Sequence, residues 1–87
     1  MNPVFDPLHI HPSIKGGLER WADHGIRPGS FLTSVLENDL FGAYQAADSD
    51  NLYALPSIVY YIRNYLPSLC YGSPGRMREW EQRFGRG

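Results

Sequence analysis

Cysteine is nearly absent from this sequence. Cys70 is the only cysteine among 87 residues, so the chain can form no internal disulfide and no metal site with two cysteine ligands. A single free thiol is typical of a protein that stays in a reducing compartment. Histidine is also scarce, and only His9 and His11 have a spacing suited to a shared metal. Two ligands without a third do not make a metal site, so we expect neither a metal nor any other cofactor.

Long apolar runs are missing as well. No stretch approaches the ~18 residues of a membrane span, and no basic segment followed by an apolar one opens the chain. We therefore expect a soluble, cytoplasmic protein with no membrane partner. Sustained alternation of polar and apolar residues is also absent, so we predict no β-strands.

An excess of positive charge is lacking too. The chain carries 8 Lys and Arg against 9 Asp and Glu, for a formal net charge of −1. Proteins that hold nucleic acid mainly by neutralising phosphates are usually basic, so nucleic acid is not the partner we expect.

Apolar and aromatic residues are plentiful. Hydrophobic residues make up 43% of the chain and aromatic residues 14%, including six Tyr and two Trp. This is ample for a folded core, and the length leaves room for one domain. A chain of this size buries roughly 60–65% of its unfolded surface, so we expect it to form a homo-oligomer.

The apolar residues recur at helical spacing, which predicts an all-α fold. An extended arm over residues 1–11, which contains Pro3 and Pro7, precedes a single helical domain over residues 12–87. We predict a small bundle of four short helices, over residues 12–24, 28–47, about 52–66 and 74–84.

Two positions leave the helix boundaries open. Asn38 and Asp39 favour helix caps, so a break there would divide the second helix and make five, whereas one unbroken helix to Ala47 fits the pattern equally well. Pro56 removes a helical hydrogen bond, so the third helix either begins nearer Leu55 or bends. Beyond Asp39, the apolar stripe continues through Leu40, Phe41, Ala43, Tyr44 and Ala47.

Catalytic groups are harder to find. A nucleophile needs a base beside it and a third group to orient that base. His24 lies at a predicted helix end, where a histidine usually serves the helix dipole, and cap or turn roles account for Asp39, Asp48 and Asp50. We therefore expect a protein that is not an enzyme.

Polar residues that the helical stripes do not need are the candidates for a ligand site. Aromatic rings stack on a nucleotide base and arginine binds phosphate bidentately, while a helix start at Pro28–Ser30 beside Arg27 is suited to an anion. The alternative is that these residues have ordinary roles at the protein surface or at an interface and bind no ligand. The candidate ligand-binding residues are Arg20, His24, Arg27, Ser30, Asn38, Asp39, Asn51 and Tyr71.

One long stretch is distinctive as an ensemble: GLERWADHGIRPGSFLTSVLENDLFGAYQAAD, with Asn51, the segment Tyr71–Pro74 and Trp80 after it. It resembles a family of small accessory proteins of tailed phages and prophages, over about Gly17 to Trp80. Pro56 and the proline-containing arm depart from the family's pattern. The resemblance implies a phage-encoded protein in the host cytoplasm, and it brings no agreed activity and no functional residues.

Three functions are consistent with these features. The first is a non-enzymatic phage accessory protein that counters host defence by binding, as an oligomeric sponge for a nucleotide immune signal. The second is a protein-interaction inhibitor or adaptor that blocks a host defence protein through its tyrosines and apolar arm. The third is a small DNA-associated regulator that binds DNA through arginines in or just after the last predicted helix. A solvated helix face is the simpler explanation of these arginines, which are Arg76, Arg78, Arg83 and Arg86.

Overall fold

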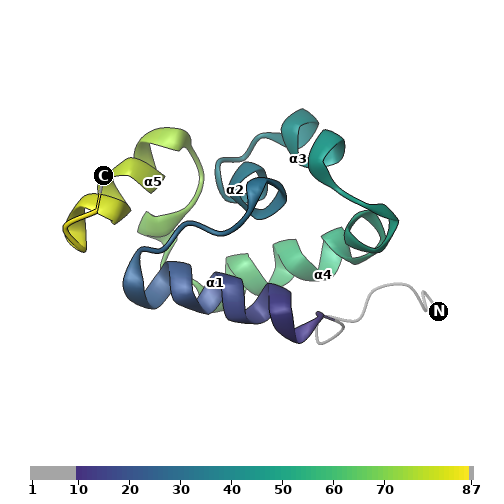
Figure 1. Cartoon of the computed structure of the whole chain (residues 1–87), viewed down its shortest axis with the longest axis horizontal. Helices are drawn as coiled ribbons and strands as arrows, with labels where there is room; N and C mark the ends of the chain where they lie inside the picture. Colours follow the sequence, from purple (N-terminus) through teal and green to yellow (C-terminus); the bar gives the residue numbers. More distant parts are fainter. Residues whose placement is uncertain (1–9, 87) are drawn as a thin grey trace.

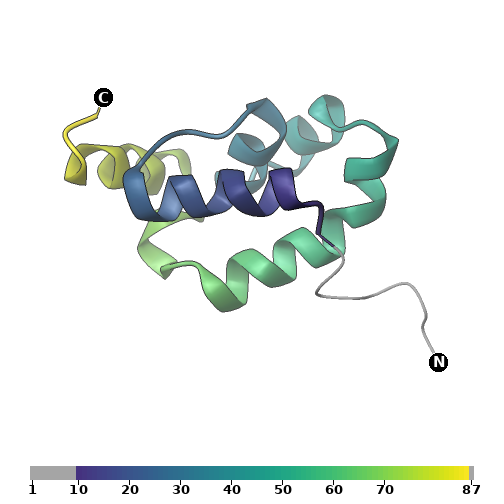
Figure 2. The same cartoon turned by 60° about the horizontal axis from the view of Figure 1, so that its bottom comes forward.

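The computed structural model describes residues 10–86, and within this range the chain forms helices and no strands, which confirms the predicted all-α fold (Figure 1). None of the helices in this range has the length and apolarity needed to cross a membrane. Figures 1 and 2 show α1 alongside α4, with α3 and α5 at opposite ends of the molecule. The elements are α1 (Pro12–His24), α2 (Ser30–Leu36), α3 (Leu40–Ala46), α4 (Ser49–Tyr65), the 3-10 helix η1 (Ser68–Cys70) and α5 (Pro74–Arg83).

Helix α1 has the predicted bounds. Pro12 stands in its first turn, and Gly25 ends it with a φ of 67°, a left-handed conformation that glycine adopts at little cost. His11 was expected in the extended arm but acts as the N-cap, because its Nδ1 accepts a hydrogen bond of 3.1 Å from the Ser13 N–H. The rest of the predicted arm, residues 1–9, lies outside the described residues.

The second predicted helix is broken, which settles the alternative that the sequence left open. Helix α2 ends at Leu36, Asn38 adopts a φ of 64°, and the Asp39 side chain caps α3 by accepting from the Gly42 N–H at 3.0 Å. Asparagine is among the few residues that tolerate this left-handed region. The predicted start at Pro28 is wrong by two residues, because Gly29 is the N-cap and has extended backbone.

Helix α4 runs through Pro56 from Ser49 to Tyr65, so it begins three residues before the predicted start at about residue 52. Asp48 sets its start by accepting from the Asn51 N–H at 2.8 Å, so the alternative start near Leu55 is wrong. Figure 2 shows that the first turns of α4 point in a different direction from the rest of the helix, as expected where proline removes a backbone donor.

The two tryptophans connect three parts of the core. Trp21 of α1 donates from Nε1 to the Cys70 carbonyl at 2.9 Å, and Trp80 of α5 donates to the Trp21 carbonyl at 3.0 Å. Their indole N–H groups are therefore satisfied inside the core. The buried apolar core consists of Leu18, Trp21, Phe31, Leu32, Leu36, Ala43, Ile58, Ile62, Leu66, Cys70, Met77 and Trp80.

The apolar stripe predicted for α3 does not enter this core. Of its residues within the helix, only Ala43 is buried, while Leu40, Phe41 and Tyr44 are exposed. The left-handed turn at Asn38 changes the direction of the chain, so α3 does not continue the buried face of α2.

Candidate ligand-binding groove

Arg27, the predicted anion-binding arginine, is committed to ion pairs within the chain. Its Nε and Nη2 donate to the two carboxylate oxygens of Glu81 at 2.7 and 3.1 Å, and its Nη1 lies 3.5 Å from Glu37. The guanidinium also lies over the Trp21 ring, 5.9 Å from its centroid. The hydrogen bond to Glu81 is the main cause that raises the pKa of Arg27. This guanidinium therefore joins α5 to the segment before α2.

The other candidates near the ends of α1 and α2 are exposed and do not form a cluster. Ser30 is the first residue of a seven-residue helix, and Arg20 lies on the exposed side of α1 close to Gly16. The carbonyl of His24 accepts a hydrogen bond of 2.8 Å from Arg86 Nε. The structure brings none of these three to a described cavity.

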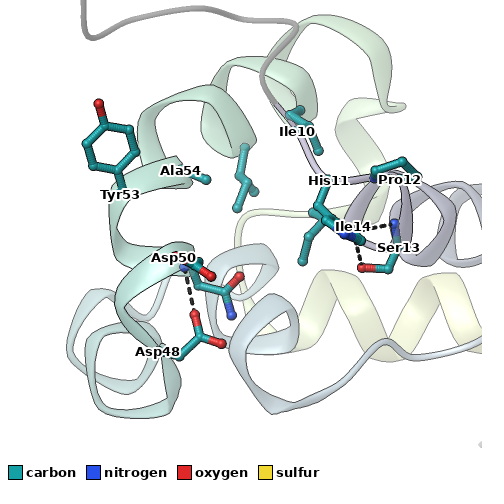
Figure 3. A pocket seen from close by; sticks show the side chains of 11 residues that line it. Ile10, His11, Pro12, Ser13, Ile14, Asp48, Asp50, Tyr53 and Ala54 are labelled. Carbon is teal, nitrogen blue, oxygen red and sulfur yellow. Dashed lines mark hydrogen bonds between the residues drawn. The ribbon is translucent and has the colours of Figure 1, made fainter.

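Asn51 lines the largest described hollow, about 590 Å³, where the first turns of α1 and α4 approach each other. Figure 3 shows His11 and Ser13 on one side of it and Asp48, Asp50 and Tyr53 on the other. His11 and Asp48 already act as helix caps through their side chains. Two carboxylates at the rim repel a phosphate, so this hollow does not suit an anionic ligand.

Residues 10–86 contain no group of three or more His, Cys, Asp or Glu side chains placed to hold a metal ion.

Asn38 and Tyr71 meet at a second hollow, of about 270 Å³, next to a residue that the sequence did not single out, Arg63. A smaller hollow of about 100 Å³ shares Val35, Asn38 and Val59 with it and also includes Asp39. We call the two together the α3–α4 groove. Its lining residues are Val35, Asn38, Asp39, Leu40, Ala43, Leu55, Val59, Ile62, Arg63, Tyr71 and Gly72.

Backbone contacts hold the loop that carries Tyr71 against the end of α2. The Gly72 N–H donates to the Leu36 carbonyl at 2.7 Å, and Arg76 Nη1 donates to the carbonyls of Ser68 and Tyr71 at 3.2 and 3.3 Å. Gly72 has a φ of 119°, and a Cβ there would lie 3.2 Å from the Arg76 guanidinium. The loop therefore requires glycine next to Tyr71.

One end of the groove carries Arg63, Asn38 and Tyr71, and the rest is lined by apolar residues and by Asp39. The side chains of Arg63, Asn38 and Tyr71 have no hydrogen-bond or ion-pair partner within residues 10–86. Each can donate a hydrogen bond, and Arg63 is the only charged residue between Asn51 and Leu66. A site with three donors beside an apolar surface suits a ligand that joins an anionic group to a ring.

The sequence contained one signal for Arg63. It follows Ile62 directly and stands four residues after Val59, so it borders the apolar face of α4. The approach of Asn38 and Tyr71 to that face depends on the fold. Comparisons of this chain with protein-family models, with curated proteins and with solved structures find no match to any of them.

Proposed function

We propose that this protein acts by binding and not by catalysis, and that the α3–α4 groove captures a small anionic ligand that carries a ring. One observation carries the proposal: Arg63, Asn38 and Tyr71, from three separate segments, line one hollow without partners inside the described chain. The guanidinium would pair with the anion, and Val59 and the Tyr71 ring would contact the ring of the ligand.

Nucleotides belong to this ligand class. A phage accessory protein that held a nucleotide-type immune signal would lower the concentration available to the host's defence. This biological setting is proposed from the resemblance in the sequence and from the size of the chain, which is reasoning by analogy.

A ligand panel tests the proposal. Cyclic mononucleotides, cyclic dinucleotides and ADP-ribose are each added to the protein, and thermal unfolding is followed. A ligand at 100 times its Kd stabilises the folded state by about 2.7 kcal/mol. Arg63→Gln should remove the shift, whereas Arg20→Gln, a change at an exposed arginine outside the groove, should preserve it. No shift with any compound, or an equal shift in Arg63→Gln, contradicts the proposal.

Arg27 provides a second control. Arg27→Gln removes ion pairs that support the fold, so it should lower the unfolding temperature of the free protein. The ligand-induced shift should remain, because Arg27 does not line the groove. If Arg27→Gln loses the ligand-induced shift in unfolding temperature and Arg63→Gln keeps it, the anion binds at the start of α2 and not in the groove.

The DNA-binding alternative gains no support from α5. Arg76 donates to two carbonyls of the neighbouring loop, Arg83 lies over the Trp80 ring at 5.0 Å, and Arg86 donates to His24. Three of the four arginines considered for DNA binding thus have contacts within the chain.

A further inference from the structure

Helix α3 exposes almost all of its apolar surface. The exposed fractions are 66% for Leu40, 81% for Phe41 and 66% for Tyr44. The spacings of three and four residues place these side chains on one side of the helix. Together they leave on the order of 500 Å² of side-chain surface in water, which is the size of the largest patches on ordinary monomers.

The patch continues onto α4 across the groove. Val59 is 43% exposed, and Leu55 is half-buried beside it. Leu40, Leu55 and Val59 bound the smaller, apolar part of the groove. The same surface therefore has a projecting ring, that of Phe41, and a recess next to it.

Charge is absent from the centre of this surface. No charged residue occurs from Leu40 to Ala46 or from Asn51 to Ile62. Asp39 and Arg63, one of each sign, line the groove at its edges. A two-fold interface brings the same patch of two copies together, so a charged centre would face its own sign. This surface avoids that repulsion.

We propose that a second copy of this chain covers the α3 patch about a two-fold axis, with Phe41 of each copy entering the apolar part of the other's groove. A two-fold interface needs a projection and its recess in one patch, and this patch has both. About 500 Å² from each copy gives a total near the ~1,000 Å² lower limit of specific interfaces, which suits a dimer that dissociates on dilution. The pairing needs no ligand and rests on Phe41 and Tyr44, which do not line the polar end of the groove, although Val59 borders both parts.

Sedimentation velocity on the full chain between about 1 µM and 1 mM tests the pairing. The wild-type chain should shift from the 9.9 kDa monomer toward twice that mass as its concentration rises. Phe41→Asp should stay monomeric at every concentration, and so should Tyr44→Asp, because each would bury an unpaired charge in an apolar interface. Circular dichroism should match the wild type, since both side chains are exposed.

Leu69→Asp is the matched control, because Leu69 is a 53% exposed apolar residue that does not line the groove. It should dimerise like the wild type. A wild-type chain that stays monomeric at 1 mM overturns the proposal, and so does equal dimerisation of Phe41→Asp. Arg63→Gln should dimerise normally while losing the ligand response, so failure of one proposal is distinguishable from failure of the other.

Discussion

Among single residues, Arg27 has the most connected polar side chain. It contacts Glu81 of α5, Glu37 at the end of α2 and the ring of Trp21. Truncation to alanine would leave two partly buried carboxylates without a cation. We expect Arg27→Ala to lower the free energy of unfolding by about 1–2 kcal/mol, measured by urea denaturation. The exposed control Arg20→Ala should change it by less than about 0.5 kcal/mol. Equal unfolding midpoints for Arg27→Ala and wild type would contradict this role.

We expect buried Cys70 to make the free energy of unfolding depend on pH in the alkaline range. Burial of the thiol raises its pKa to about 11 from an ordinary value of 9.0. Well below pH 9 the thiol is protonated in both states and contributes no pH dependence. Above pH 9 the unfolded chain loses the proton first, so stability should fall as the pH rises, by up to about 1.4 kcal/mol per pH unit. Urea unfolding at pH 8 to 10 measures this slope.

Cys70→Ala separates the thiol from other groups that titrate in the same range. The pKa of Tyr61 is also raised, first by burial and then by Glu19, so tyrosine contributes above its ordinary value of 10.0. Between pH 9 and 10 the alanine variant should lose most of the slope. An identical slope in both proteins would exclude Cys70 as its source.

Residue types alone could not assign the roles of the arginines. Glu81, the ion-pair partner of Arg27, is 54 residues away in sequence, and no local sequence pattern predicts this ion pair. Arg63 became a candidate only when the fold placed Asn38 and Tyr71 beside it. Asn38, Asp39 and Tyr71, which the sequence offered as ligand-binding candidates, lie along one groove, and their binding role stays a prediction.

At the scale of elements, the junction of α2 and α3 depends on Gly42. A Cβ at this position would clash with the Asp39 carboxylate and lie 2.9 Å from Ser34 Oγ. Alanine is a better helix former than glycine, yet Gly42→Ala should destabilise the protein by about 1 kcal/mol because it displaces the cap of α3. Urea unfolding measures the change.

Gly75 of α5 gives the matched comparison. A Cβ there would meet only ordinary contacts at 3.8 Å. Gly75→Ala should therefore stabilise the protein by about 0.5 kcal/mol, from helix propensity alone. Stabilisation by both substitutions would show that the Asp39 cap tolerates the added methyl group.

Local chemistry predicted most helix boundaries, because caps act over three residues. Ser73 and Pro74 start α5 as expected, and Asp48 caps α4. Periodicity failed at two places for physical reasons. A proline can precede a helix as well as open it, which moved the start of α2 beyond Pro28, and the spacing within α3 carries no information on the direction that the turn at Asn38 imposes.

At the scale of the whole molecule, the apolar residues form both a buried core and an exposed patch. The stripes of α1 and α2 build the core together with Ile58 and Ile62 of α4, whereas the stripe of α3 forms the proposed pairing face. Only the arrangement of all five helices distinguishes these uses, since Leu40 and Leu36 have the same chemistry and the same helical spacing.

The most direct test of the proposed ligand site is amide chemical-shift mapping during titration with whichever nucleotide stabilises the protein. Binding in the α3–α4 groove should shift the backbone amide signals of Asn38, Arg63, Tyr71 and Gly72 together, with one saturation curve. The amides of Ser13 and Asn51, at the larger acidic hollow, should stay in place. Shifts confined to that hollow or to the start of α2, with the groove signals unchanged, would contradict the account.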